Sequence, residues 1–306
     1  MVMINERLDR WAADIEKRLE FMTCMLSPPD FMGETIRYSL LGGGKRLRGA
    51  MLLAANEALG GDYNEALPFA AALEMIHCFS LIHDDLPAMD NDDVRRGKPS
   101  NHIKFGEGFA ILAGDTLLAF AAEQMMNEAS NEPKRMAPRL NAALAIMHAA
   151  SVRGIAGGQY LDLLGANAAE LRDADDHKRS EWTIMLDRLK TAALFQAAVA
   201  AGFILAGGGE AEEDIAFTYG NMLGLAFQVR DDMLDIEGDP AAMGKRTGKD
   251  ADKLTLPAIE GMEWCQRLVD MVENEALNSL KPLGEKGELL AGFVDIIREY
   301  SVKSKA

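Results

Sequence analysis

The residues Phe69-Ala-Ala-Ala-Leu-Glu-Met-Ile-His-Cys-Phe-Ser-Leu-Ile-His-Asp84 make a helical pattern that is apolar on nearly every side. Such a helix belongs at the centre of a bundle, because other elements must cover all of its faces. Helical periodicity continues over most of the chain, and strand-like alternation is nearly absent. The sequence therefore predicts an all-α fold with a single large helical core.

Glycine, proline and aspartate clusters separate the expected helices. These helices cover about residues 5–24, 30–41, 46–60, 65–86, 107–129, 136–156, 179–205, 211–236, 254–274 and 287–301. The polar stretch from Ala166 to Lys178 is expected to be a surface connection. With no fixed repeat and no long linker, the chain is predicted to form one domain over residues 1–306.

The composition excludes several classes of function. A total of 48 acidic residues against 32 basic ones gives a net charge of −16, which disfavours nucleic-acid binding. The N-terminus is charged and amphipathic, unlike a signal peptide, and no uncharged apolar run reaches the roughly 18 residues of a spanning helix. The 3 cysteines are too widely spaced for a disulfide framework or a zinc cluster. We therefore expect a cytoplasmic protein without stable membrane insertion.

Two acidic clusters each end a long apolar helical pattern, namely Asp84-Asp85-Leu-Pro-Ala-Met-Asp90 and Asp231-Asp232-Met-Leu-Asp235. A helix C-terminus disfavours negative charge, so a bound cation would stabilise carboxylates there. Pro87 should end or kink the first helix and allow Asp90 to fold back. In the second cluster, residues four apart share one helix face. The two clusters can face each other, and their oxygen-only ligands favour Mg²⁺.

Two basic runs predict phosphate-binding sites. Gly42-Gly-Gly-Lys45-Arg46-Leu-Arg48 places glycines before a helix start and cations directly after them. Arg95-Arg96-Gly97-Lys98 supplies a second cationic group beside the first acidic cluster. Neither run has the spacing of a P-loop. Together they predict two phosphate subsites, one bridged by metal and one held directly by Lys and Arg.

At these motifs the chain closely resembles the trans-isoprenyl diphosphate synthases of the polyprenyl synthetase family, especially the bacterial farnesyl and geranylgeranyl diphosphate synthase type. The resemblance runs from about residue 30 to 300. It is carried by Leu81-Ile-His-Asp-Asp-Leu-Pro-Ala-Met-Asp-Asn-Asp-Asp-Val-Arg-Arg-Gly-Lys-Pro99 and by Gly224-Leu-Ala-Phe-Gln-Val-Arg-Asp-Asp-Met-Leu-Asp235. It implies the isoprenoid synthase fold, a helical bundle around a central cavity, and a homodimer.

The resemblance also implies a role for each matching residue. Mg²⁺ ions, three in each active site, would bind the allylic diphosphate and the side chains of Asp84, Asp85, Asp90, Asp231, Asp232 and Asp235. Arg95 would contact the same diphosphate, and isopentenyl diphosphate would bind Lys45, Arg48, His77 and Arg96. The leaving diphosphate and the developing carbocation would be surrounded by Gln159, Asp162, Lys190, Thr191, Gln228 and Lys245.

The implied chemistry is ionisation, condensation and elimination. Metal ions and cationic side chains stabilise the departing diphosphate, which leaves an allylic carbocation in a water-poor cavity. The double bond of isopentenyl diphosphate attacks the carbocation. Loss of a proton, to the departing diphosphate, then gives a longer trans-allylic product.

Product length should depend on what blocks the growing tail. Phe79 lies roughly 7–8 Å before Asp84 along the helix and is followed by Ser80. An aromatic residue at this place resembles the pocket floor of a farnesyl-producing enzyme, although ordinary core packing is the alternative. We expect a C15 product, with C20 as the alternative.

The chain departs from the family pattern at several positions. Gly49 replaces the usual Pro, which is expected to loosen that turn, and Asp187 stands where His commonly precedes Lys190-Thr191. The stretch between Gly248 and Lys253 is shorter than usual, which argues against a diphosphate contact from Lys253. The basic tail is reduced to Lys303 and Lys305.

Two other classes of protein would share part of this sequence pattern. A class I terpene cyclase would ionise a similar substrate, but its second metal motif normally mixes Asn, Ser or Thr with Glu, and it needs no Lys45/Arg48 subsite. A noncatalytic subunit of a heteromeric synthase should lose an aspartate cluster, whereas both clusters are present here. The sequence therefore favours the synthase.

Overall fold

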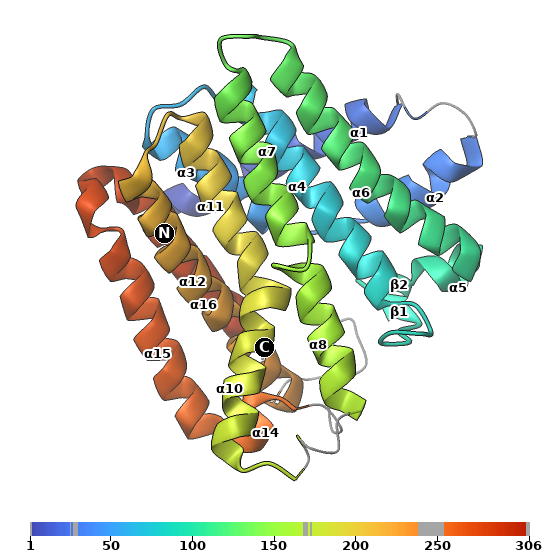
Figure 1. Ribbon diagram of the computed structural model, residues 1–306, viewed down its shortest axis with the longest axis vertical. Coiled ribbons are helices and arrows are strands. Elements are labelled where there is room, and N and C mark those ends of the chain that lie inside the picture. The colour runs from blue at the N-terminus through green and yellow to red at the C-terminus, as the bar shows by residue number, and fades with distance from the viewer. Residues whose placement is uncertain are drawn as a thin grey trace. The chain divides into compact units, whose positions relative to one another are not determined.

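The computed structural model describes residues 2–24, 26, 30–167, 171, 173–237 and 254–303. The chain divides into two compact units, and Figure 1 labels their helices and strands. Unit 1 comprises Met1–Met147 and Ala200–Gly209, and unit 2 comprises His148–Val199 and Glu210–Ala306. The prediction of one domain over residues 1–306 stays a prediction.

Unit 1 is built mainly from helices and contains the apolar stretch Phe69–Asp84. Its elements are α1 (Val2–Cys24), α2 (Asp30–Leu40), α3 (Leu47–Ala58), α4 (Tyr63–Asp84), β1 (Val94–Arg95), β2 (Lys98–Pro99), α5 (Asn101–Phe105), α6 (Glu107–Ser130) and most of α7 (Met136–Ala150). The C-terminal end of α11 (Ala193–Leu205) also belongs to this unit.

Within the described residues of unit 2, the regular secondary structure is entirely helical. Its elements are α8 (Ile155–Asn167), α10 (Asp176–Asp187), the π-helix η1 (Arg188–Ala192), the first part of α11, α12 (Glu210–Glu237), α14 (Leu256–Glu260), α15 (Met262–Ser279), the 3₁₀-helix η3 (Lys281–Gly287) and α16 (Glu288–Lys303). Helices α12 and α15 pack against each other along a core that includes Leu225, Val229, Val269 and Val272.

The predicted all-α fold is confirmed, while some predicted boundaries are wrong. Among the described residues the strands are limited to the short antiparallel pair β1–β2. The helix expected over residues 136–156 ends at Ala150, and α8 begins at Ile155 after a turn. The expected connection from Ala166 to Lys178 is shorter than predicted, because Asp175 caps α10 by accepting a 2.8 Å hydrogen bond from the Lys178 N–H.

Helix α4 is buried over most of its length, as its composition requires. Asp62 begins the helix by accepting a 2.8 Å hydrogen bond from the Asn64 N–H. The core residues that follow, from Phe69 to Ile76, are at most 2% exposed. Helices α3 and α6 pack against α4, so its C-terminal acidic residues are carried by a well-supported element.

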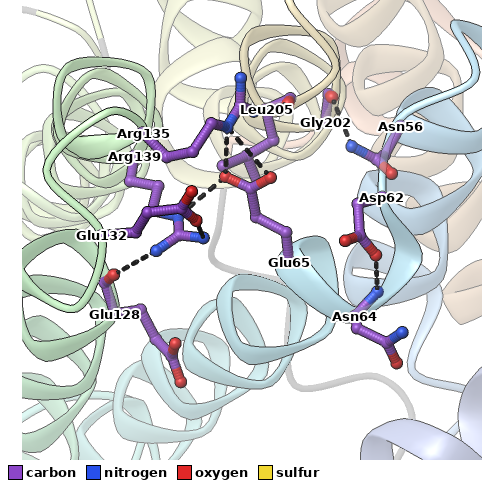
Figure 2. A network of polar contacts seen from close by, with 10 residues as sticks. All are labelled: Asn56, Asp62, Asn64, Glu65, Glu128, Glu132, Arg135, Arg139, Gly202 and Leu205. Carbon is purple, nitrogen blue, oxygen red and sulfur yellow. Dashed lines mark hydrogen bonds and ion pairs between the residues drawn. The ribbon is translucent and has the colours of Figure 1, made fainter.

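Figure 2 shows a network of polar contacts near the N-terminal end of α4. Glu65 accepts hydrogen bonds from Arg135 Nε at 3.0 Å and from Arg139 Nε at 2.8 Å. Its side chain is only 10% exposed. Arg139 also donates to the carbonyl of Glu128. The Glu65 carboxylate therefore ties α4 to α7, and Arg139 ties α7 to the end of α6.

A close helix contact in unit 1 depends on Gly202 of α11. A Cβ atom there would lie 2.4 Å from the carbonyl oxygen of Leu52 and 2.7 Å from Cβ of Ala55, both on α3. The Asn56 side chain donates to the Gly202 carbonyl at 3.4 Å (Figure 2). The absence of a side chain thus allows the backbones of α3 and α11 to touch.

Within the described part of the chain, three helical stretches are long and apolar enough, by length and composition only, to cross a membrane: Tyr63–Asp84, Glu107–Ser130 and Asp176–Leu205. In their most apolar windows, 72%, 44% and 61% of the residues, respectively, are buried inside the protein. The expectation that the chain does not insert stably into a membrane stays a prediction.

Gly202→Ala should destabilise the protein, because the new methyl group meets α3 backbone that has no room to move. We expect a loss of about 1–3 kcal/mol in the free energy of unfolding, measured by urea denaturation. Gly108→Ala is the matched control: Gly108 lies in α6, and a Cβ atom there would meet nothing within 4 Å. That control should be neutral or slightly stabilising. Equal stability of both variants would contradict the contact.

Candidate active site

The first acidic cluster folds back on itself, as the position of Pro87 predicted. Helix α4 ends at Asp84. The Asp90 N–H then donates to the Asp84 carbonyl at 2.9 Å, and the Asp92 N–H donates to the Asp85 carbonyl at 3.1 Å. Asp84 and Asp90 are both partly buried. The backbone itself therefore brings these two residues together.

Asp85 is bound to Arg95. The carboxylate is 2% exposed and accepts hydrogen bonds from Arg95 Nε at 3.0 Å and Nη2 at 2.5 Å. Burial raises the pKa of Asp85, although the charge and hydrogen bonds of Arg95 act in the opposite direction. Asp85 therefore orients an arginine beside the cluster, and its predicted role as a metal ligand stays a prediction.

A two-residue turn joins β1 to β2. Arg95 is the last residue of β1, and Arg96 is the first residue of the turn. Arg96 and Gly97 have φ angles of 54° and 72°, so both turn residues are left-handed, as in a type I′ hairpin. Arg96 Nη1 donates to the Gly43 carbonyl, and a Cβ atom on Gly44 would lie 3.0 Å from the guanidinium carbon. The hairpin therefore reaches both Asp85 and the glycine-rich loop.

The predicted cationic group assembles around that loop. Arg48 Nη1 lies 3.2 Å from His77 Nε2, and Lys45 is exposed. Burial lowers the pKa of Arg48 to about 10. Burial, followed by the charges of Arg48 and Arg96, lowers the pKa of His77 well below its ordinary value. His77 is therefore a neutral acceptor among cations, and the group concentrates positive charge beside the glycine-rich loop.

In unit 2, five of the predicted residues form one hydrogen-bonded pair and one three-residue chain. Lys190 Nζ lies 2.6 Å from Asp162 Oδ2. The Thr191 hydroxyl donates to Gln228 Oε1 at 2.7 Å, and Gln228 Nε2 donates to Asp232 Oδ1 at 2.7 Å. Asp232 is thus oriented by a neighbouring amide.

The second acidic cluster lies near the end of α12. Asp231, Asp232 and Asp235 are all partly buried, and Gln159 of α8 is 8% exposed. A Cβ atom on Gly158 would lie 2.3 Å from the backbone nitrogen of Lys190. Gly158 therefore lets α8 approach η1, which carries the Lys190–Thr191 pair.

The donor atoms fit Mg²⁺ that arrives with a substrate. Within the described residues, no group of at least 3 His, Cys, Asp or Glu side chains could hold a metal ion alone. Mg²⁺ commonly binds one or two carboxylates plus substrate phosphates and waters, whereas dedicated all-protein cages are unusual for it. Asp84 with Asp90, and the carboxylates of α12, supply oxygen ligands of this kind.

Comparison with known proteins decides the family. A sequence model of the Polyprenyl synthetase family matches residues 29–282. The chain belongs to the polyprenyl synthetase family. It is 41% identical over 271 residues to geranylgeranyl diphosphate synthase of Cyanophora paradoxa, covering 88% of this chain and 87% of that protein. It is 38% identical over 302 residues to farnesyl diphosphate synthase of Bacillus subtilis, covering 96% and 98%.

Solved structures agree with this assignment. A crystal structure described as an FPP/GFPP synthase from Zymomonas mobilis matches with a TM-score of 0.84 at 31% identity, covering 96% of this chain and 98% of that one. The chain is thus a prenyl-transferring synthase of the short-chain kind with the isoprenoid synthase fold. Relatives named for farnesyl and for geranylgeranyl products both occur.

Gly49, where this polyprenyl synthetase departs from the family's usual proline, does not loosen the turn as expected. Its N–H donates to Glu74 Oε1 at 2.8 Å, a bond that proline could not make. A Cβ atom at Gly49 would lie 2.8 Å from Cδ1 of Ile15 and 3.1 Å from the Ala70 carbonyl oxygen. The turn is instead anchored to α4 and tightly packed.

Asp187, the other notable departure in this synthase, is buried at 4% exposure. Burial raises its pKa well above the ordinary value, and the charges of Asp232 and Asp162 add to that effect. Its electrostatic neighbours also include Lys190. The sequence indicated Asp187 only as a departure from the family pattern. Its place three residues before Lys190 was the signal that this carboxyl group could lie near the site.

Phe79 is 9% exposed and makes an edge contact with the His83 ring, with ring centroids 5.7 Å apart. The Ser80 hydroxyl donates to the His77 carbonyl at 2.9 Å. His83 in turn lies 3.1 Å from the Ile111 carbonyl of α6. Phe79 is therefore packed firmly on one face of α4, below the acidic cluster.

Some predicted residues lie outside the described part of the chain. These are Lys245, Lys253 and Lys305, together with Gly248. Lys303 belongs to α16. The predicted roles of these residues stay predictions.

Acidification should reveal that His77 is neutral in the folded protein. The unfolded imidazole takes up a proton below a pKa of about 6.5, whereas the native one resists protonation. Stability should therefore fall as the pH drops from 7 to 5, with His77 contributing up to about 2 kcal/mol of that loss. Urea unfolding at both pH values measures it, and His77→Asn should reduce the loss.

His148→Asn is the matched control, because His148 is exposed on α7. This variant should retain the full pH dependence of the wild type. If His77→Asn lost as much stability as the wild type between pH 7 and 5, the native His77 would be shown to take up the proton.

Proposed function

We propose that this protein condenses isopentenyl diphosphate with C5 and C10 allylic diphosphates, and that farnesyl diphosphate (C15) is its main product. The observation that carries the proposal is the cationic group of unit 1, in which Arg48, neutral His77 and Arg96 meet beside exposed Lys45. Such a group suits a diphosphate bound by direct ion pairs. The family assignment supports the same reaction.

The allylic diphosphate is assigned to the acidic clusters and Arg95. Asp84, Asp85, Asp90, Asp231, Asp232 and Asp235 would hold Mg²⁺, with three ions proposed in each active site. Bound Mg²⁺ would supply Lewis-acid stabilisation of the charge that grows on the leaving diphosphate. Asp85 keeps Arg95 in one orientation through two hydrogen bonds, so this cation needs little reorganisation during ionisation.

The side chains of unit 2 extend this proposal. Lys190 would add positive charge to the leaving diphosphate, and Asp162 would hold it in place. The Thr191–Gln228–Asp232 chain would fix the dipoles that face the carbocation. As the allylic carbon–oxygen bond breaks, the double bond of isopentenyl diphosphate forms the new carbon–carbon bond. The displaced diphosphate then accepts the proton lost from the adduct.

We also propose a cytoplasmic homodimer. Support for self-association comes from apolar side chains on unit 1 that remain exposed. On α6, Phe109, Leu112 and Met126 are 51%, 50% and 59% exposed, and on α7 Leu144 is 53% exposed. Such surfaces commonly mark protein interfaces. The free state of Cys24, Cys78 and Cys265 agrees with a reducing compartment.

Product assays test the proposed reaction directly. Purified protein is incubated with Mg²⁺, isopentenyl diphosphate and a C5, C10 or C15 primer in separate reactions, and products are sized by chromatography. We expect C15 product from the C5 and C10 primers, little elongation of the C15 primer, and no condensation when a chelator removes divalent cations. Absence of condensation with every primer would reject the proposal; cyclic hydrocarbon would instead indicate a cyclase, and elongation of C15 a C20 synthase.

Phe79→Ala should lengthen the product. Removal of the ring opens space on the α4 face about one and a half helical turns from Asp84, so C20 and longer products should appear from the C10 primer. Phe79→Tyr retains the ring and serves as the control, with mainly C15 product expected. An unchanged product distribution in Phe79→Ala would show that Phe79 is only a packing residue.

A further inference from the structure

Glu74 of α4 is a buried carboxylate that joins two parts of the glycine-rich loop. It is 2% exposed, accepts a 2.8 Å hydrogen bond from the Gly49 N–H, and lies 3.8 Å from Arg46 Nη1. Gly49 belongs to the first turn of α3, whose N–H groups have no partners within the helix. Glu74 therefore binds an end of α3 that favours negative charge.

Arg46 is held equally firmly. It is 3% exposed, and its guanidinium donates to Glu16 at 2.6 and 3.0 Å and to the Leu40 carbonyl at 2.5 Å. The φ angle of Arg46 is 50°, a left-handed conformation that L-residues adopt only when the surroundings require it. The contacts of Glu16, Leu40 and Glu74 supply that requirement.

The loop conformation determines where its two substrate-facing cations lie. Lys45 directly precedes Arg46, and Arg48 lies between Leu47 and Gly49 in the first turn of α3. On α4, His77 is three residues after Glu74, so the two side chains share one face of the helix. Glu74 thus fixes α3 to α4 next to the place where Arg48 meets His77.

We propose that Glu74 is a positioning residue for isopentenyl diphosphate, acting through the Gly49 N–H and the Arg46 guanidinium. Its carboxylate sets the direction of Lys45 and the spacing of Arg48 from His77. This inference rests on the proposed function, which assigns isopentenyl diphosphate to these cations. The other substrate is assigned to different residues, so a loss of Glu74 should affect the two substrates unequally.

Glu74→Gln tests the assignment by steady-state kinetics. The amide can still accept from Gly49 but no longer offsets the buried charge of Arg46. We expect KM for isopentenyl diphosphate to rise about tenfold, the ratio that follows from losing one charged hydrogen-bonding interaction. KM for the C10 allylic substrate and kcat should stay within about twofold of the wild type.

Glu65→Gln is the matched control. Glu65 is also a largely buried glutamate of α4 and is paired with two arginines, Arg135 and Arg139 (Figure 2). The control therefore removes the same charge from the same helix away from the glycine-rich loop. It should lower the melting temperature without raising KM for isopentenyl diphosphate.

Glu16→Gln keeps the test valid if Glu74→Gln fails to fold. Glu16 is 30% exposed and contacts Arg46 from α1, so its substitution should be tolerated. It should raise KM for isopentenyl diphosphate by about threefold, because it removes one partner of Arg46 and leaves the bond from Gly49 to Glu74 in place. A change in KM for isopentenyl diphosphate that exceeds the change in Glu65→Gln supports the inference.

Two results overturn the inference, and they are distinguishable. Condensation by the wild type, with KM for isopentenyl diphosphate unchanged in Glu16→Gln and in any folded Glu74→Gln, would show that the network is only structural. Absence of condensation by the wild type would overturn the proposed function and the inference with it.

Discussion

The burial of α4 is the constraint on which the rest of the molecule depends. A helix that is apolar on all sides must be covered on all sides, and α3 and α6 provide much of that cover in unit 1. Its C-terminal end nevertheless carries Asp84 and Asp85, where the helix dipole disfavours anions. The Arg95 guanidinium, which donates two hydrogen bonds to Asp85, offsets part of this negative charge. The end of this buried helix therefore carries acidic residues of the candidate site.

Much of the fold and part of the site follow from local sequence rules. The apolar periodicity of α4 predicted its central place, and Pro87 predicted the return of the chain toward Asp84. The meeting of Arg48, His77 and Arg96 required more than those rules: the motifs that resemble the polyprenyl synthetases suggested it. The structure brings these side chains together.

The features that sequence reasoning missed depend on contacts between distant segments. Gly157 and Gly158 lowered the helical signal where α8 begins, because glycine disfavours helices. In the structure, Gly158 is required by the close approach of the Lys190 backbone. Gly49 was likewise expected to weaken a turn, whereas its N–H and lack of a side chain let α3 pack against α4. A sequence does not distinguish a glycine that is required by a closely packed neighbouring segment from a glycine that makes the backbone flexible, because the neighbouring segment is distant in the chain.

The hairpin β1–β2 has a further consequence. Adjacent arginines leave its tip in different directions, one toward the Asp85 carboxylate and the other toward the Gly43 carbonyl. The two-residue turn at Arg96 and Gly97 keeps these two cationic side chains on neighbouring residues while their partners lie on different segments of the chain. Under the proposed function, this short piece of β-structure would therefore present one cation to each of the two diphosphates.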